Sequence, residues 1–396
     1  MLPNEIRTTF MIGLIFASRM LGIFMIFPVL ALYVNHYPDA SMTLVGCALG
    51  SYGLLQALLQ LPLAALSDKY GRKRVILAGL CLFAFGSVIA ASATTLWGIT
   101  IGRAIQGAGA IGATLLAYLS DTTRPAVRTR AMAIVGICIG ATFTLSVAIG
   151  PIVDAYFGIK GLFWLTAVLG LFGMGWVMRM PSQQADAALL QTLSFAPKEL
   201  AVAIHHRHLW RLYLSIFVLH AVLTMSFLVV PHKVQAILAL DKAQSWQFYV
   251  PVLIGSLLCV GPFLRRADDE AAQKKGIMVA VIGLFCVMPI WLQTQQTIIF
   301  VIMSVLFFAF FNYLEASMPA MVSKVAPSTR RGLVLGVYSS VQFLGLFFGG
   351  VIGGVLCQYW PNWGVAVLST MLLGLWLMVI SNISFKKTYE FGEQKI

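Results

Sequence analysis

One carboxylate stands inside a long apolar stretch of this chain and needs a chemical explanation. Glu315 lies within the run 296–322, and Asn312, three residues earlier, falls on the same face of a helix. An ionisable group costs roughly 2.5–3.5 kcal/mol at the middle of a bilayer unless it is paired or hydrated. A carboxylate that moves between a closed and an open cavity could load and release a proton. The alternative is a permanent structural partner of a buried arginine.

Two arginines also lie within apolar stretches, Arg19 in the first and Arg103 in the fourth. A guanidinium stays charged, so each needs an acceptor or water on the inside of a helix bundle. Arg103 and Gln106 share a helix face. Each arginine could handle substrate or protons, or could lock helices together through backbone carbonyls. We expect Glu315 to be the proton-coupling acid and the two arginines to modulate it.

Polar side chains recur at helical spacing on further apolar stretches. Hydroxyl and amide groups spaced in this way face either a cavity or a partner helix, and both interpretations remain open. For the histidine among them, a packing role is the simpler interpretation. The candidate cavity and substrate residues are Tyr52, Gln56, Gln60, Gln106, His220, Asn312, Tyr338 and Gln342.

The elements that hold these residues must be helices in a membrane. The chain has 396 residues, 59% hydrophobic and 10% charged, whereas a soluble domain carries about a quarter charged residues. About 20 apolar residues cross a ~30 Å hydrocarbon layer as a helix, and backbone in lipid must satisfy its own hydrogen bonds. We predict an all-α membrane protein with twelve transmembrane helices, at 10–34, 42–66, 74–93, 95–120, 130–153, 161–180, 209–231, 245–264, 275–293, 296–322, 333–357 and 362–384.

The charge distribution predicts the topology. The net charge is +13, and the cations concentrate in alternate loops, which by the positive-inside rule places both termini in the cytoplasm of a bacterial inner membrane. This pattern argues against nucleic-acid binding. All six cysteines lie in apolar stretches at no metal-ligand spacing, so we expect packing residues, no metal and no cofactor.

An internal repeat divides the chain into two halves. Asp68 aligns with Asp268 when the chain is shifted by 200 positions, and several glycines and prolines at span ends align with it. Parallel repeats around a central site are typical of secondary transporters. We expect two pseudo-symmetric six-helix bundles, 1–181 and 209–396, joined by a cytoplasmic linker at 182–208 that holds a short amphipathic helix at 197–203.

Small residues on the fifth and eleventh stretches let helix backbones approach closely. Close packing is the simpler interpretation. A gating interface, at which the two halves slide past each other, is the more specific one. The residues concerned are Gly136, Gly140, Gly150, Pro151, Gly336, Gly345 and Gly349.

Several motifs together resemble the major facilitator superfamily. The charged turn Asp68-Lys69-Tyr70-Gly71-Arg72-Lys73-Arg74 resembles its signature loop between helices 2 and 3. Arg103-Ala104-Ile105-Gln106-Gly107 is similar to its helix 4 signature, and Gly150-Pro151 to its antiporter motif. The segments around Arg19, Glu315 and Gln342 resemble the YajR-type branch of its twelve-helix drug:proton antiporters. The resemblance covers nearly the whole chain.

The resemblance implies a gating loop made of Asp68, Gly71, Arg72 and Asp121. It implies that Asp68 caps the N-terminal end of helix 11 in the outward-open state, where a carboxylate is favoured by the helix dipole. It also implies that Arg72 links Asp68 to Asp121.

Three departures from the family pattern stand out. Ala64 replaces the usual glycine before the turn, and Asp154-Ala155 replaces a glycine pair after Gly150-Pro151. The chain also ends soon after the last span, without the C-terminal cytosolic domain of the YajR type.

We therefore expect a proton-coupled secondary transporter that exports small amphipathic or drug-like compounds by alternating access. Its partners would be a small-molecule substrate, protons and membrane lipid, and it would act as a monomer. A metabolite or siderophore exporter, or an importer, of the same fold is the close alternative. A membrane receptor or intramembrane enzyme is a distant one, because the chain has no phosphate-binding loop, zinc-ligand pair or nucleophile elbow.

Overall fold

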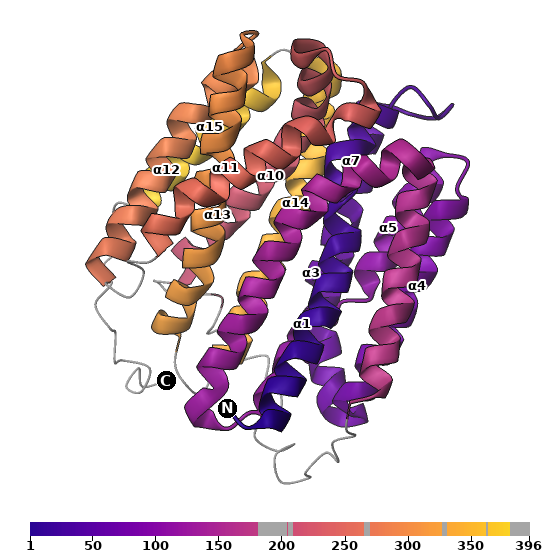
Figure 1. Ribbon diagram of the computed structural model, residues 1–396, viewed down its shortest axis with the longest axis vertical. Coiled ribbons are helices and arrows are strands. Elements are labelled where there is room, and N and C mark those ends of the chain that lie inside the picture. The colour runs from indigo at the N-terminus through magenta and orange to yellow at the C-terminus, as the bar shows by residue number, and fades with distance from the viewer. Residues whose placement is uncertain (181–203, 205–208, 265–269, 327–330, 362, 381–396) are drawn as a thin grey trace.

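The computed structural model describes residues 1–396 except 181–203, 205–208, 265–269, 327–330, 362 and 381–396. All regular structure in the described residues is helical (Figure 1). The amphipathic helix expected at 197–203 lies outside the described residues.

The N-terminal half forms six membrane crossings from eight helical segments. The first crossing and the fourth are each built from more than one segment. The segments are α1 (Pro3–Phe24), α2 (Phe27–Leu30), η1 (Ala31–Tyr33), α3 (Met42–Tyr70), α4 (Arg72–Ser92), α5 (Leu96–Ala108), α6 (Gly112–Thr122) and α7 (Pro125–Met178).

The C-terminal half also forms six crossings, with one short helix in the loop between its first two. Its segments are α10 (Leu209–Leu238), η2 (Lys242–Gln244), α11 (Trp246–Leu264), α12 (Glu270–Gln293), α13 (Thr297–Val325), α14 (Arg331–Tyr359) and α15 (Gly364–Ile380).

The helix α7 makes two crossings. Its 54 residues would extend about 80 Å if straight, far more than a bilayer core. The chain turns back at Gly158 (Figure 1). Its φ of 64° and ψ of −176° form a conformation that glycine adopts readily because it has no Cβ. Ten described segments, α7 included, are long and apolar enough to cross a membrane, and α15 is a shorter apolar helix. With α7 counted twice, the twelve predicted transmembrane helices are confirmed.

Two turns define the ends of the molecule. Gly71, with φ 93°, separates α3 from α4, and we call this end of the bundle the Gly71 end. Gly158 lies at the opposite end, which we call the Gly158 end. The N-terminus lies at the Gly71 end, where Arg124 contacts Glu5 at 2.9 Å.

The fourth crossing is broken in its middle. The helix α5 ends at Ala108 and α6 begins at Gly112, so the Gly109 carbonyl lies outside the helical hydrogen-bond pattern and accepts the Ile111 N–H at 2.9 Å. A Cβ on Gly109 would collide with the backbone of Gly79 on α4, so close packing requires glycine there. The break supplies a polar backbone group inside the bundle.

The two halves meet mainly along α3 and α14. Near the Gly158 end, a Cβ on Gly46 or on Gly350 would clash with the carbonyl of the other. Thr43 Oγ1 also donates to Gln358 Oε1 at 2.6 Å. These helices are therefore in backbone contact at this end.

A loop carboxylate caps α5 at the Gly158 end. Asp39 Oδ1 accepts the N–H of Leu96 at 2.9 Å, and its Oδ2 accepts the N–H of Trp97 at 3.0 Å. The pKa of Asp39 lies below its ordinary value of 3.8 because the Leu96 backbone N–H donates to the carboxylate. Its ionised form therefore stabilises the fold.

We expect Asp39→Ala to lower the unfolding temperature in a pH-dependent way. A group whose folded-state pKa is depressed contributes fully above its unfolded-state pKa, here near 3.8, and loses its contribution as the pH falls through the folded-state pKa. The mutant should be less stable than the wild type at neutral pH and converge with it in acid. Tryptophan fluorescence during heating measures the difference. An asparagine side chain keeps an acceptor oxygen, so Asp39→Asn should lose less; a pH-independent difference would contradict the assignment.

Candidate functional site

Glu315 on α13 meets side chains from two other helices. The Gln342 amide on α14 donates from Nε2 to Glu315 Oε1 at 3.1 Å. Nε2 of His220, on α10, lies 3.6 Å from Glu315 Oε2 and 2.7 Å from Gln342 Nε2. We call Glu315, His220 and Gln342 the Glu315 cluster. The sequence marked each of them separately, and the fold brings them together.

The hydrogen bonds of His220 define how the cluster can hold a proton. Nδ1 lies 3.2 Å from the carbonyl oxygen of Ile216, one turn earlier on α10, so it donates there. Nε2 of the neutral ring is then an acceptor, and the Gln342 amide can donate one hydrogen to His220 and one to Glu315. A proton on Nε2 would turn that atom into a donor, and Glu315 Oε2 is placed to accept it.

The Glu315 side chain is partly accessible from outside the protein. Its side chain is 23% exposed, whereas His220 is 2% exposed. The predicted neighbour Asn312 instead turns toward α11, where its Nδ2 donates to Ser256 Oγ at 3.3 Å. Tyr338, one turn before Gln342 on α14, is buried. Only Gln342 of the predicted α14 pair therefore contacts the carboxylate among the hydrogen bonds of the described residues.

Aromatic rings lie beside the cluster, toward the Gly158 end. Phe311, one turn before Glu315 on α13, lies 5.8 Å from the His220 ring and 5.3 Å from Phe143 of α7, between ring centroids. Phe143 also packs on Phe24 at 4.9 Å. The cluster thus has titratable groups next to an apolar layer that joins the two halves.

Arg19 is held inside the N-terminal half. Its Nη2 donates to the Gly109 carbonyl at 2.9 Å, Tyr52 Oη at 3.1 Å and Gln56 Oε1 at 3.2 Å. The guanidinium carbon also lies 5.5 Å from the centre of the Phe83 ring, within cation–π range. The carbonyl freed by the break between α5 and α6 is therefore one of its acceptors.

Arg103 is equally buried. Its Nη1 donates to Gln106 Oε1 at 3.0 Å, and Gln106 Nε2 donates to Ser87 Oγ at 2.7 Å. The guanidinium lies 5.0 Å from the centre of the Tyr52 ring. Arg19 and Arg103 are 1% and 0% exposed.

Neither arginine forms an ion pair with Glu315. Among the ion pairs of the described residues, Arg19 and Arg103 have no carboxylate within 4.0 Å. The ion pair considered from the sequence is therefore not formed, and both guanidiniums donate instead to neutral acceptors in their own half. Arg19 Nε and Arg103 Nη2 are buried without a hydrogen-bond partner among the described residues. Neither arginine therefore contacts Glu315 directly among the described ion pairs.

The polar stripe of α3 forms a hydrogen-bonded chain in place of a cavity wall. Tyr52 Oη donates to Gln56 Oε1 at 3.0 Å, and Gln56 Nε2 donates to Gln60 Oε1 at 2.9 Å. Gln60 Nε2 then donates to the carbonyl of Gly336 on α14 at 3.3 Å. All three side chains are 1% exposed. Of the two interpretations of this stripe, the structure shows helix-to-helix hydrogen bonding.

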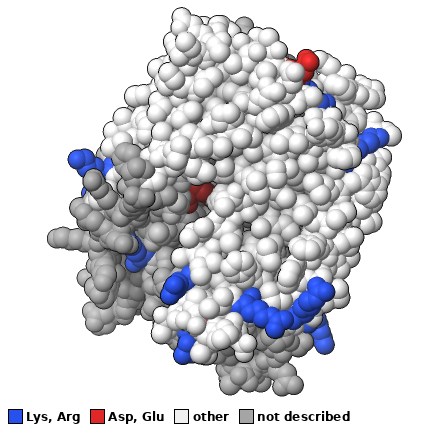
Figure 2. Space-filling model, in the orientation of Figure 1, with Lys and Arg blue, Asp and Glu red and all other residues white. Residues whose placement is uncertain are grey.

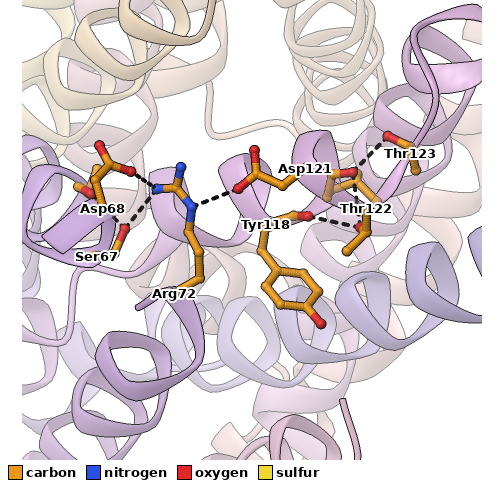
Figure 3. A network of polar contacts seen from close by, with 9 residues as sticks. Ser67, Asp68, Arg72, Tyr118, Asp121, Thr122 and Thr123 are labelled. Carbon is orange, nitrogen blue, oxygen red and sulfur yellow. Dashed lines mark hydrogen bonds and ion pairs between the residues drawn. The ribbon is translucent and has the colours of Figure 1, made fainter. Parts of the chain in front are cut away.

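The charged turn forms the link that the motif implies. Arg72 bridges two acids, Asp68 Oδ1 at 2.5 Å and Asp121 Oδ2 at 2.9 Å, and donates to Ser67 Oγ at 2.9 Å (Figure 3). The described ion pairs and hydrogen bonds of Asp68 involve no residue of α14. The residues just before α14, 327–330, lie outside the described residues, so the helix cap implied for the outward-open state stays a prediction.

Some of the predicted packing glycines are in tight contact. A Cβ on Gly150 would clash with the Met25 carbonyl, and one on Gly345 or Gly349 would clash with the backbone of α10. Gly336 faces Leu61 of α3. Pro151 lies within α7, next to Gly150. Close packing is therefore present at these positions.

Gly136 and Gly140 depart from that prediction. A Cβ on either would meet nothing within 4 Å. On α7 they share a helix face with Phe143, which contacts Phe311 of the other half. They lie nearer the Gly71 end than Phe143, and no described atom of the other half lies within 4 Å of a Cβ built at either position. Figure 2 shows a hollow on one face, with acidic atoms recessed in it.

The comparisons with known proteins agree on the family. The family model of the Major Facilitator Superfamily matches residues 12–313. The chain is 37% identical to the inner membrane transport protein YajR of Escherichia coli (strain K12), over 97% of this chain and 84% of that protein. It is 34% identical to the tetracycline resistance protein, class H, of Pasteurella multocida, over 38% of each chain.

The solved structures show the same fold. The crystal structure of a D-xylose-proton symporter matches with a TM-score of 0.74 at 15% identity, covering 96% of this chain and 98% of that one. A helical membrane chain with this architecture, motif loop and family match is a transporter and not an enzyme. The chain belongs to the major facilitator superfamily.

Proposed function

We propose that this chain is a proton-coupled transporter that exports small amphipathic or drug-like compounds by alternating access. The observation that carries the proposal is the Glu315 cluster, where a carboxylate and an imidazole share the Gln342 amide 2.7–3.1 Å away. Both titratable groups lie inside a membrane protein, where such groups are costly and mark ion pathways. The adjacent aromatic layer suits an apolar or amphipathic substrate.

The helix α14 offers a route from proton binding to movement of the halves. It carries Gln342, which contacts Glu315, and Gly336, whose carbonyl accepts from Gln60 of the other half. Protonation of His220 at Nε2 removes an acceptor for the Gln342 amide, and protonation of Glu315 turns one of its acceptor oxygens into a donor. A change in the cluster would therefore act on the helix that packs along α3.

The distribution of contacts suits an inward-open state of that cycle. We place the Gly71 end and both termini in the cytoplasm, because cations gather there (Figure 2). The halves are in backbone contact near the Gly158 end, through Gly46 and Gly350, and no described atom of the other half lies within 4 Å of a Cβ built at Gly136 or Gly140. We further propose that the chain works in a bacterial inner membrane and as a monomer, with the Asp68 loop closing on α14 in the outward-open state.

Proteoliposomes with an imposed pH gradient test this function. A library of amphipathic compounds is added on one side, and a pH dye reports the lumen. We expect at least one compound to move protons in the direction opposite to its own, and only in vesicles that contain the protein. Proton movement in the same direction as the compound would contradict export by antiport and favour an importer. No proton response to any compound that is itself transported would contradict proton coupling.

A further inference from the structure

A cluster of one carboxylate, one ammonium and one phenol lies at the Gly158 end, away from the Glu315 cluster. Asp154 of α7 has a fully buried side chain, and its Oδ2 lies 3.3 Å from Nζ of Lys242 on η2. Tyr33 of η1 donates its hydroxyl to Asp154 Oδ1 at 2.6 Å. The Lys242 ammonium also stands 3.5 Å from the centre of the Tyr33 ring. The acid is thus held by a phenol and a cation at once.

This trio joins the two halves of the molecule. Asp154 and Tyr33 belong to the N-terminal half and Lys242 to the C-terminal half. Five ion pairs occur among the described residues, and the other four each lie within one half. Lys242 with Asp154 is therefore the one ion pair in the described part of the chain that crosses between the halves.

The geometry of the acid is fixed from its own half. The Tyr33 hydroxyl accepts the backbone N–H of Ile159 at 3.1 Å while it donates to Asp154. Ile159 directly follows the turn at Gly158. The N-terminal half therefore presents a positioned carboxylate, and Lys242 completes the site only when the other half is close. Removing the cation from a buried carboxylate leaves an unpaired charge, which is strongly unfavourable.

We propose that Asp154, Tyr33 and Lys242 form a gate that holds the Gly158 end closed while the Gly71 end is open. The proposal rests on the alternating-access function proposed above. It gives Asp154 a role at the position where the family motif has glycine. The ion pair must break before the halves can separate at the Gly158 end, so Lys242 sets how often that end opens.

Hydrogen–deuterium exchange of the full chain in lipid nanodiscs tests the gate without any substrate. In Lys242→Gln we expect exchange of the backbone amides in 31–40 and 151–160 to rise about 5- to 30-fold, the factor by which a change of about 1–2 kcal/mol shifts an equilibrium. Lys242→Arg keeps the cation and should restore slow exchange. Lys160→Gln removes an exposed lysine beside Gly158 and should leave exchange unchanged.

Three outcomes would overturn the gate. They are unchanged exchange in Lys242→Gln, an equal rise in Lys160→Gln, and a rise spread over the whole chain including α4, which would indicate general destabilisation. The readout needs neither protons nor a transported compound. Failure of the proteoliposome assay would therefore contradict the proposed function while leaving the exchange difference intact, and the reverse result would contradict only the gate.

Discussion

Glu315→Gln should lower substrate-driven proton movement about 5- to 150-fold, the range that corresponds to coupling free energies of about 1–3 kcal/mol between two sites. Glutamine keeps the size and an acceptor oxygen for the Gln342 amide, which now contacts Glu315 Oε1 at 3.1 Å, but it cannot titrate. Substrate binding should persist, because the aromatic layer around Phe311 is unchanged. The measurement is proton flux and compound binding in the same proteoliposomes.

The matched variant is Glu315→Asp, which keeps a titratable carboxylate on a shorter side chain. It should retain part of the flux. Equal flux in Glu315→Gln and the wild type would remove Glu315 from the proton pathway. Loss of compound binding in Glu315→Gln would instead assign the carboxylate to the substrate.

Gly350→Ala should disable the cycle by preventing contact at the Gly158 end. An added Cβ would lie closer than 3 Å to the Gly46 carbonyl of α3, and overpacking of this kind costs about 1–3 kcal/mol. The Cβ is bonded directly to the backbone of α14 and the oxygen belongs to the backbone of α3, so neither atom can move without its helix. We expect reduced transport and faster amide exchange in 42–53 and 346–354.

Gly175→Ala is the control for this substitution. A Cβ on Gly175 of α7 would meet nothing within 4 Å, so the change should be neutral or stabilise the helix by up to about 1 kcal/mol. Similar losses in both variants would show that helical glycine itself matters, and would contradict the role of backbone contact between α3 and α14.

Local sequence patterns predicted the crossings well and their ends less well. Apolar runs placed twelve helices, yet α7 starts at Pro125 and not at 130, and the fourth run breaks at Gly109. Helix ends depend on single turn residues and on capping partners such as Asp39, which lies far from α5 in the chain. A hydropathy average contains no information on either.

Contacts between distant residues account for most of what the sequence did not show. The spacing of Tyr52, Gln56 and Gln60 predicted a polar stripe, but only the fold shows that it runs to Gly336. His220 and Glu315 lie 95 positions apart in the chain, so no helical periodicity relates them.

The gate residues illustrate the same limit. Asp154 was visible only as a departure from a family motif, and neither Tyr33 nor Lys242 stood out at all. Their contact joins residues from three elements, η1, α7 and η2. The sequence did contain one signal, because Asp154 is a lone acid near the end of an apolar stretch. The charge pattern could have identified it as a candidate.

The partners of Arg19 bear on how the chain enters the membrane during synthesis. Its acceptors come from Tyr52, Gln56 and Gly109, which is made 90 residues later. When the first crossing reaches the lipid, its guanidinium has none of them, at a cost of about 2.5–3.5 kcal/mol, while each Leu, Ile, Phe or Val returns only about 0.3–0.6 kcal/mol. The first crossing must therefore insert through the hydrophobicity of its own apolar residues. This accounts for a segment of 31 residues that contains an 18-residue window with a mean hydropathy of 2.1.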